Sequence, residues 1–451
     1  MSWGKAQVLA LKAAFTALDN TNIDWMVLRN HQGLPNVNRS KDVDIGVEKV
    51  NFRRAEKAIS DALLRTGFDR VMVQNFQYIR CLTFFSTVES TPNSIKIDLV
   101  DGFPFRGAQV FNFRLLYSNA HRDSEFTVPD LVDDAVMLWC KPLVTGGIVK
   151  ARYLTEIKYA AQSHPSDFKA ELHRILTPIW ANRVWSRIEA DDIESTINMM
   201  TQLRKSVWWR AFLTNPILTL RNTVSHIITE LVRRTQRNPA TLFAVLGPDG
   251  VGKTTFIEHF SRMLGDLQFK DENSIKIYHF RPHMLPNINK LLTGKSEVIS
   301  EFNNPHSAKP ASMPSSFLRI TYYWMDYLLG YWINLRGQII KGRTIIFDRY
   351  FYDFIVDPRR SRLSLPGWIV GLYLTLTPKP DLIFFLDANA DQIFTRKQEL
   401  QPNEIKRQLT EYRKIVGKYP NRFVCLDASK SPEEIAKKAI LEVVLRLYRV
   451  N

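Results

Sequence analysis

Residues 241–256 read TLFAVLGPDGVGKTTF, and this stretch decides the fold of the second half of the chain. Its first six residues form a short apolar run, which is typical of a strand buried on both faces of a sheet. The run leads directly into the spacing G-x-x-x-x-G-K-T, from Gly247 to Thr254. Apolar residues then recur at helical spacing at Phe256, Phe260 and Leu264. The order of strand, glycine-rich loop and helix predicts a loop that cradles phosphate groups.

The chemistry of this loop follows from its residue types. Glycines allow backbone N–H groups to close around phosphate oxygens at the start of a helix. We expect Lys253 to reach the β and γ phosphates of a nucleoside triphosphate, and the Thr254 hydroxyl to bind magnesium. An acid at position 249 is electrostatically odd beside phosphate. The candidate nucleotide-binding residues of the loop are Gly247, Asp249, Gly250, Gly252, Lys253, Thr254 and Thr255.

The rest of the second half alternates between apolar runs and helical patterns. We expect further buried strands at 274–280, 343–348, 381–387 and 422–427, and helices notably at 316–340, 404–418 and 431–449. This alternation predicts a parallel, doubly wound α/β sheet. Ligands of such sheets lie at the carboxyl ends of the strands. Charged residues gather at those ends, with Asp348 and Arg349 after one strand and Arg281 after another.

Three stretches of the second half carry a family resemblance: GPDGVGKTT (247–255), FDRYFYD (347–353) and PDLIFFLDA (380–388), the last followed by RKQEL. With them, residues 240–451 resemble the thymidylate kinase family of P-loop nucleoside monophosphate kinases. The resemblance implies that Asp249 contacts the sugar 3′-hydroxyl of a nucleotide acceptor. It therefore implies a deoxynucleoside monophosphate that faces a nucleoside triphosphate.

The same resemblance implies roles for further charged residues. Asp348 corresponds to a magnesium-linked acid, and Arg349 to an arginine that grips the transferring phosphate and acts in catalysis with Lys253. Arg396 and Lys397 resemble a basic lid over the phosphates, although a solvated helix face is the alternative. The family usually carries an Arg-Glu-Pro-Gly-type stretch where this chain has HFRPH (279–283). Arg281 is retained there, but the acid and the glycine are not, which leaves the base of the acceptor open.

The first half carries a pair of acids in the stretch SKDVDIGVEK (40–49). Asp42 and Asp44 alternate with aliphatic residues, so a strand would place both carboxylates on one face and the aliphatic side chains on the other. Neighbouring carboxylates repel each other unless a cation lies between them. The pair therefore predicts a divalent-metal site, with surface aspartates on an edge strand as the alternative.

A third acid supports the metal site. Asp98 lies in the alternating stretch SIKIDLVDGF (94–103), in phase with Lys96. Three carboxylates from two strands could hold a pair of magnesium ions that activates an attacking hydroxyl and steadies a departing pyrophosphate.

This set of acids resembles the nucleotidyltransferase superfamily of the small polymerase-β-like kind, in which Asp42, Asp44 and Asp98 match the three catalytic, metal-binding acids. The stretch VLRN and the loop after it replace the usual glycine-serine turn, although Ser40 closely precedes the acids and Arg29 could contact the triphosphate. Helices expected within 128–162 resemble the lobe that holds the nucleotide tail or the acceptor in related transferases.

The composition is that of a globular protein with a basic bias. The chain of 451 residues has 61 Lys and Arg against 45 Asp and Glu, a formal net charge of +16. This charge favours acidic partners such as nucleotides, with nucleic acid open but less favoured. No apolar run reaches 18 residues, so we expect no transmembrane segment. Three widely spaced cysteines make neither a disulfide framework nor a zinc site, which suits a reducing cytoplasm.

Together these patterns predict an α/β chain with three parts: a nucleotidyltransferase-type α+β domain (1–120), a helical lobe and connector (121–239), and a doubly wound P-loop kinase domain (240–451). The expected function is magnesium-dependent nucleotidyl transfer from a (deoxy)nucleoside triphosphate to a hydroxyl acceptor by the first half. The second half would bind or phosphorylate a nucleotide. Alternatively, it senses nucleotide without turnover and regulates the transferase, for example in the synthesis of a short, thymidine-containing nucleotide signal. The sequence does not identify the hydroxyl acceptor. It is compatible with a homo-oligomer or with a partner protein.

Overall fold

The computed structural model describes residues 3–38, 40–88, 92–123, 125–145, 149–235, 241–286 and 311–451. The chain divides into two compact units. Unit 1 comprises Met1–Ser86, Ser94–Gln236 and Arg449–Asn451, and unit 2 comprises Thr87–Asn93 and Arg237–Tyr448. The last three residues thus return to unit 1, whereas the sequence predicts a single kinase domain that runs to residue 451.

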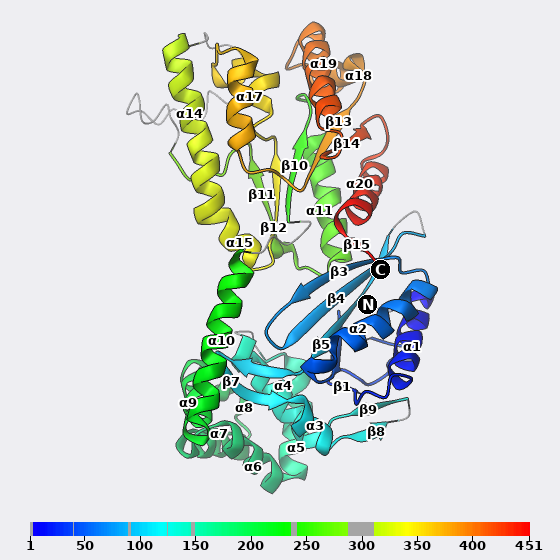
Figure 1. Ribbon diagram of the computed structural model, residues 1–451, viewed down its shortest axis with the longest axis vertical. Helices are drawn as coiled ribbons and strands as arrows, with labels where there is room; N and C mark the ends of the chain where they lie inside the picture. Colours follow the sequence, from blue (N-terminus) through cyan, green and yellow to red (C-terminus); the bar gives the residue numbers. More distant parts are fainter. Residues whose placement is uncertain are drawn as a thin grey trace. The chain divides into compact units, whose positions relative to one another are not determined.

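Unit 1 contains a mixed sheet of six strands in the order β1-β2-β5-β4-β3-β15 (Figure 1). The strands are β1 (Met26–Val27), β2 (Val43–Gly46), β5 (Asn93–Val100), β4 (Ile79–Ser86), β3 (Arg70–Asn75) and β15 (Arg449–Val450). β2 and β5 run parallel, and their register places Asp44 opposite Asp98. β1 pairs antiparallel with β2, and β3 pairs antiparallel with both β4 and β15.

One face of this sheet is covered by α1 (Lys5–Asp19) and α2 (Phe52–Arg65), which pack against each other. Leu11 and Phe15 of α1 share an apolar core with Ile45 of β2 and Ile97 of β5. Because side chains alternate along a strand, the acids next to these core residues lie on the opposite face of the sheet. The period-two pattern of the sequence is therefore realised in the structure, although Asp42 itself directly precedes β2.

The remainder of unit 1 is a helical lobe with two small hairpins. The helices are α3 (Phe113–Ser118), α4 (Leu131–Thr145), α5 (Ala151–Ser163), α6 (Pro165–Ile175), α7 (Pro178–Glu189), α8 (Ile193–Asn198), α9 (Met200–Thr214) and α10 (Pro216–Thr235). The hairpins are β6 (Gly102–Phe105) with β7 (Ala108–Asn112), and β8 (His121–Asp123) with β9 (Phe126–Val128). Trp139 of α4 is fully buried in the core of the lobe, and its indole N–H donates to Thr196 Oγ1 over 3.0 Å. This hydrogen bond satisfies the one polar group of a large buried side chain.

Helix α10 packs against the rest of unit 1 through small polar side chains and leaves several apolar side chains exposed. Thr219 and Asn222 are buried, whereas Ile217 and Val224 are more than half exposed. Gly107, with φ of +91°, approaches this helix so closely that a Cβ would lie 2.4 Å from a backbone nitrogen of α10. Both the left-handed backbone and the close approach require glycine at this position.

Unit 2 contains a five-stranded sheet in the order β11-β12-β10-β13-β14, and all paired strands are parallel. The strands are β10 (Leu242–Leu246), β11 (Ile275–His279), β12 (Thr344–Asp348), β13 (Leu382–Asp387) and β14 (Phe423–Asp427). Every residue of the central strands β10 and β12 is buried, as their apolar sequences predict. The prediction of a buried strand was wrong for β11, whose side chains are half-buried or exposed because it forms the edge of the sheet.

Helices α11 (Lys253–Leu267) and α20 (Pro432–Leu447) of unit 2 lie side by side (Figure 1). The remaining helices are α14 (Met313–Leu329), α15 (Arg336–Ile340), α16 (Asp353–Val356), α17 (Gly367–Leu376), α18 (Ala390–Arg396) and α19 (Pro402–Lys418). A π-helical segment, Gly330–Leu335, joins α14 to α15 where the sequence predicts one continuous helix. Short 3₁₀ turns occur at Lys49–Asn51 in unit 1 and at Glu272–Ser274 and Pro358–Ser361 in unit 2. Within the described residues, no helix combines the length and the apolar character needed to cross a bilayer.

Candidate functional sites

The glycine-rich loop of unit 2 connects the end of β10 to the first residue of α11, as its sequence predicts. Gly250 has φ of +86°, and a Cβ on it would lie 2.9 Å from the Cβ of Lys397. Gly252, the N-cap of α11, is also left-handed, with φ of +103°. These backbone conformations favour glycine, and they leave the first turn of α11 in the geometry that binds anions.

Lys253 is the first residue of α11, and its side chain folds back over the loop. The ammonium donates to the carbonyl oxygens of Gly247 over 3.0 Å and Pro248 over 2.9 Å, and it lies 3.7 Å from Asp249 Oδ1. Burial, together with the positive charge of Arg349, lowers the pKa of Lys253 to about 8.

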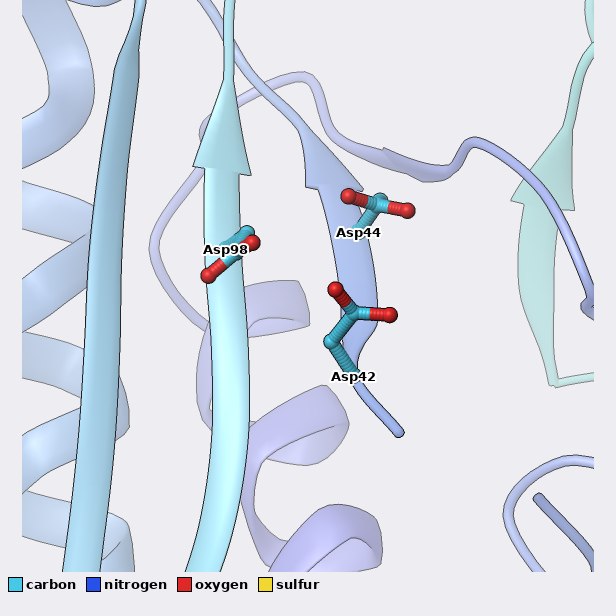
Figure 2. A group of neighbouring side chains, drawn as sticks. All are labelled: Asp42, Asp44 and Asp98. Carbon is cyan, nitrogen blue, oxygen red and sulfur yellow. The ribbon is translucent and has the colours of Figure 1, made fainter. Parts of the chain in front are cut away.

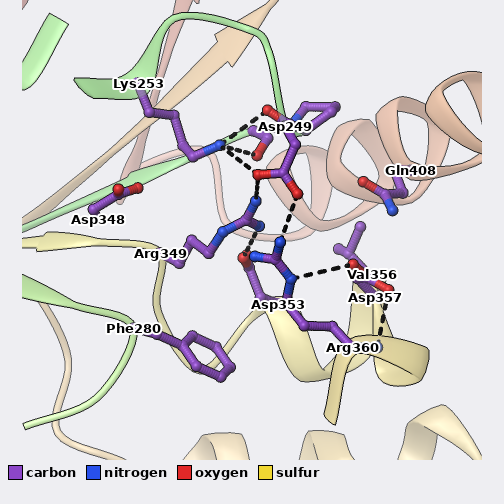
Figure 3. A network of polar contacts seen from close by, with 12 residues as sticks. Asp249, Lys253, Phe280, Asp348, Arg349, Asp353, Val356, Asp357, Arg360 and Gln408 are labelled. Carbon is purple, nitrogen blue, oxygen red and sulfur yellow. Dashed lines mark hydrogen bonds and ion pairs between the residues drawn. The ribbon is translucent and has the colours of Figure 1, made fainter. Parts of the chain in front are cut away.

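Asp249, the unexpected acid of the loop, is held by two arginines (Figure 3). Its Oδ1 contacts Arg349, and its Oδ2 accepts a 2.6 Å hydrogen bond from Arg360. Burial alone would raise the pKa of Asp249, but the charges of Arg349, Lys253 and Arg360 hold it well below its usual range. The carboxylate is thus ionised, and its negative charge is compensated within the protein.

Arg349 directly follows β12 and is almost completely buried, with 2% of its side chain exposed. It has a left-handed backbone, with φ of 73°, which is unfavourable for a long side chain. Its guanidinium also donates to Asp353 over 2.6 Å, and Tyr412 donates to the other oxygen of Asp353 over 2.8 Å. These contacts hold the arginine in one position beside the phosphate loop.

Asp348, at the carboxyl end of β12, lies opposite the neighbouring edge strand. Its Oδ2 is 3.1 Å from His279 Nδ1 of β11, whereas its Oδ1 is buried without a hydrogen-bond partner. Burial would raise the pKa of Asp348, but the hydrogen bond from His279 and the charge of Lys253 keep it below its usual value. An ionised carboxylate with an unpartnered oxygen suits a magnesium ion, with the hydroxyl of Thr254 as a further oxygen ligand.

A cavity of about 660 Å³ brings the predicted residues of unit 2 together. It is lined by residues that the sequence singles out, Asp249, Gly250, Gly252, Lys253, Thr254, Thr255, Arg281, Asp348, Arg349, Arg396 and Lys397. Arg396 also donates to the carbonyl of Ala428 over 3.1 Å, and Lys397 pairs with Glu399 over 2.9 Å. Arg281 pairs with Asp326 over 3.3 Å and lies over the ring of Tyr323.

Sequence reasoning missed several residues of this site. Arg360, Tyr323 and His279 line the cavity, and Asp353 orients Arg349. Asp353 lies within the quoted stretch FDRYFYD, four residues after the arginine, which is the helical spacing for an ion pair. Arg360 carries no such signal, because it reaches Asp249 from 111 positions away in the chain.

The three acids of unit 1 also come together. One oxygen from each of Asp42, Asp44 and Asp98 lies within 4.8 Å of the others (Figure 2). The parallel register of β2 and β5 places Asp44 opposite Asp98, and Asp42 directly precedes β2. Among the described residues, this is the group of three or more acids, histidines and cysteines that could hold a metal ion.

Positive and polar side chains surround the cluster. Arg29 contacts Asp44, and Ser40 donates to Asp42 Oδ1 over 2.8 Å. Lys96 lies 3.3 Å from Asp42 Oδ2 and 3.2 Å from Asp98 Oδ2. Burial would raise the pKa of Asp42, but the charges of Lys96 and Arg29 hold it well below its usual range. Both residues that the sequence proposes beside the acids, Arg29 and Ser40, therefore touch the cluster.

Asp98 is the acid with the most unusual environment. Burial and the negative charges of Asp44 and Asp42 together raise its pKa to about 6, against the lowering effect of the Lys96 charge. Its Oδ1 is buried without a hydrogen-bond partner. Like-charged carboxylates with an unpartnered oxygen suit a divalent cation, which would relieve both the repulsion and the lost hydration. Magnesium, which prefers oxygen ligands, fits this donor set.

Comparisons with known proteins bear on the kinase-like part of the chain. A probable thymidylate kinase of Methanosarcina barkeri is 30% identical over 126 residues, which cover 26% of this chain and 62% of that protein. A thymidylate kinase of Mesoplasma florum is 28% identical over 225 residues, or 44% of this chain and 93% of that protein. The chain thus spans about three fifths of the length of its Methanosarcina relatives. Part of the chain is therefore similar to thymidylate kinases.

Protein families and solved structures were compared as well. No protein-family model matches the chain. The crystal structure of a thymidylate kinase from Ehrlichia chaffeensis is 15% identical and covers 46% of this chain and 99% of that chain, with a TM-score of 0.32.

Proposed function

We propose that the chain is a bifunctional nucleotide-handling enzyme. Unit 1 transfers a nucleotidyl group from a (deoxy)nucleoside triphosphate to a hydroxyl acceptor, and unit 2 binds or phosphorylates a nucleotide. The observation that carries the first activity is the cluster of Asp42, Asp44 and Asp98, with carboxylate oxygens within 4.8 Å of one another and cationic side chains around it.

In unit 1 the attacking hydroxyl oxygen forms a bond to the α-phosphorus, and the bond to the departing pyrophosphate breaks. Magnesium bound by the three acids would activate the hydroxyl and offset the charge on pyrophosphate. Arg29 orients Asp44 through their contact, and Ser40 orients Asp42. Lys141 of α4 lies close enough to influence the pKa of Asp42, and burial lowers its own pKa. Its charge would then help to bind the phosphates.

In unit 2 the γ-phosphoryl group of a triphosphate would pass to an acceptor in the 660 Å³ cavity. Lys253 and the start of α11 bind the phosphates of the donor, and Asp348 with Thr254 would hold magnesium. Arg349, fixed by Asp353, offsets the charge of the transferring group. Catalysis in such a site depends mainly on positioning and on charge neutralisation. Arg396 and Lys397, at the end of α18, line the cavity and would contribute positive charge to the phosphates.

Two assays on the full chain test the proposal. In the first, the protein is incubated with magnesium and all eight nucleoside and deoxynucleoside triphosphates, while pyrophosphate is measured and products are identified by mass spectrometry. The double substitution Asp42→Asn and Asp44→Asn should abolish pyrophosphate release, whereas Asp61→Asn, an exposed acid on α2, should not. Release at the wild-type rate in the double variant would refute the assignment of the acids.

The second assay separates a kinase from a sensor. With ATP and a deoxynucleoside monophosphate, an active unit 2 forms the diphosphate, and Asp348→Asn abolishes it. A sensing unit binds nucleotide and raises the melting temperature by mass action, yet forms no diphosphate. The pairing of Asp249 with two arginines favours testing acceptors other than thymidine monophosphate alongside it.

A further inference from the structure

Lys96 stands out in the acid cluster because its charged end lies among the carboxylates rather than in solvent. Lys96 and Asp98 are two positions apart on β5, so their side chains share one face of the strand. The ammonium nitrogen is 3.2 Å from Asp98 Oδ2 and 3.3 Å from Asp42 Oδ2. It therefore bridges Asp42, which directly precedes β2, and Asp98 of β5.

The charges of the cluster can be counted from these contacts. Three carboxylates contribute three negative charges. Lys141 of α4 lies near all three acids, and two further positive charges are in direct contact with them, because Arg29 contacts Asp44 and Lys96 contacts Asp42 and Asp98. These two charges equal that of one divalent cation. A pair of magnesium ions would add four more positive charges and leave the cations repelling one another across a few ångströms.

The remaining oxygens also favour a single ion. Asp98 Oδ1 is buried and accepts no hydrogen bond from a nitrogen or oxygen donor, so it is available as a ligand, although the Cys81 thiol lies close enough to the Asp98 carboxyl to lower its pKa. Asp42 Oδ2 and Asp98 Oδ2, in contrast, both contact the Lys96 ammonium. A second ion bridging Asp42 and Asp98 through these oxygens would have to share them with that ammonium.

We infer that Lys96 takes the place of a second divalent cation, so that the acid cluster holds one ion instead of the pair that its three carboxylates suggest. This inference rests on the proposed function of unit 1, because it concerns the metal of the same site. Lys96 acts as a positioning residue: it keeps Asp42 and Asp98 together while the single ion binds through the oxygens that the lysine leaves available.

Manganese binding tests the inference without any measurement of activity. Nucleotide-free, full-length protein is titrated with Mn²⁺, and free Mn²⁺ is followed by its electron paramagnetic resonance signal. The number of ions at the cluster is the difference in bound Mn²⁺ between the wild type and the double variant Asp42→Asn and Asp44→Asn. Any ion bound by unit 2 is present in both proteins and cancels. We expect about one ion at the cluster in the wild type and about two in Lys96→Met. Lys57→Met, at an exposed lysine of α2, removes the same charge and should keep the wild-type count.

Thermal unfolding gives a second readout. Lys96→Met leaves buried carboxylates without their cation, so its melting temperature in EDTA should fall, and Mn²⁺ should raise it by more than it raises that of the wild type. Two ions at the wild-type cluster, or a count that stays at one in Lys96→Met, would overturn the inference. If Lys96→Met does not fold, Lys96→Gln is used in its place. The number of Mn²⁺ ions bound at the wild-type cluster also tests the inference by itself, because two ions there would overturn it. Failure of the proposed transferase site looks different: the double asparagine variant then binds as much Mn²⁺ as the wild type.

Discussion

The buried pair of Arg349 and Asp353 yields a quantitative prediction for unit 2. Asp353 is 1% exposed, its Oδ2 accepts from Arg349 over 2.6 Å, and its Oδ1 accepts from Tyr412 over 2.8 Å. Asp353→Asn preserves the shape of the side chain but removes its charge. The Arg349 guanidinium then lies in the same buried site with Asp249 as its remaining acidic partner.

The size of the effect follows from the cost of an uncompensated buried charge. Removing one partner of a buried ion pair lowers the free energy of unfolding by about 3–5 kcal/mol. Because Arg349 keeps Asp249, we expect the lower end of this range, about 3 kcal/mol. For a unit of this size the melting temperature should fall by about 6–12 °C.

Hydrogen exchange as a function of urea measures this loss in the full chain. Peptides from β12 and α19 report on unit 2 alone, which avoids treating a chain with two units as a single transition. Glu411→Gln is the matched control: Glu411 pairs with Lys414 on the same helix at a largely exposed site, where an ion pair contributes less than about 1 kcal/mol. A loss in Asp353→Asn no larger than in Glu411→Gln would refute the argument that Asp353 compensates the buried arginine.

Three further predictions concern other parts of the chain. Burial lowers the pKa of Lys270 to about 8, below 10.5 in an unfolded chain. The unfolded state therefore binds more protons between these values, and the free energy of unfolding rises with pH through this window. Lys270→Met should remove this pH dependence and raise the free energy of unfolding by about 3 kcal/mol near pH 7. Urea titrations at several pH values test this, and an equal change of the free energy of unfolding with pH in both proteins would contradict it. Gly107→Ala should destabilise unit 1 by about 2 kcal/mol or more, because the new Cβ would clash with Thr223. In hydrogen exchange, the variant should show a larger increase over the wild type in the amides of α10 than in those of α4. Lys253→Ala should weaken the binding of a non-hydrolysable triphosphate at least about tenfold in calorimetry, while the exposed control Lys430→Ala keeps the wild-type affinity.

The parts of both sites that follow from local patterns could be predicted from the sequence. The phosphate loop is one continuous stretch, so its spacing specifies strand, turn and helix together. Asp42 and Asp44 share a face because of the two-residue period of a strand. Asp98 could be added because its own strand shows the same alternation, although the parallel register that places it opposite Asp44 is visible only in the structure.

Contacts between distant segments could not be predicted in the same way. Arg360 follows a short helix and carries no motif, yet it meets Asp249 across 111 positions. Residues 449–451 return to the sheet of unit 1, where Arg449 pairs with Glu56 over 2.9 Å. Nothing in the composition of the last helix distinguishes this return from a chain that simply ends there. Such contacts depend on tertiary packing, which local periodicity does not encode.

The two partners of Asp249 differ in a way that bears on the acceptor of unit 2. Arg349 is 2% exposed and also held by Asp353, so it cannot leave without exposing a buried acid. Arg360 is 20% exposed, lies at the end of a short 3₁₀ turn and has Asp357 as its other acidic neighbour at 3.9 Å. An acceptor hydroxyl that hydrogen-bonds to Asp249 therefore competes with Arg360 rather than with Arg349. Displaced from Asp249 Oδ2, Arg360 would still line the same cavity and could turn its charge toward a phosphate of the acceptor. An acceptor that carries both a hydroxyl and a phosphate would satisfy both groups at once, and this is the chemistry of a nucleoside monophosphate.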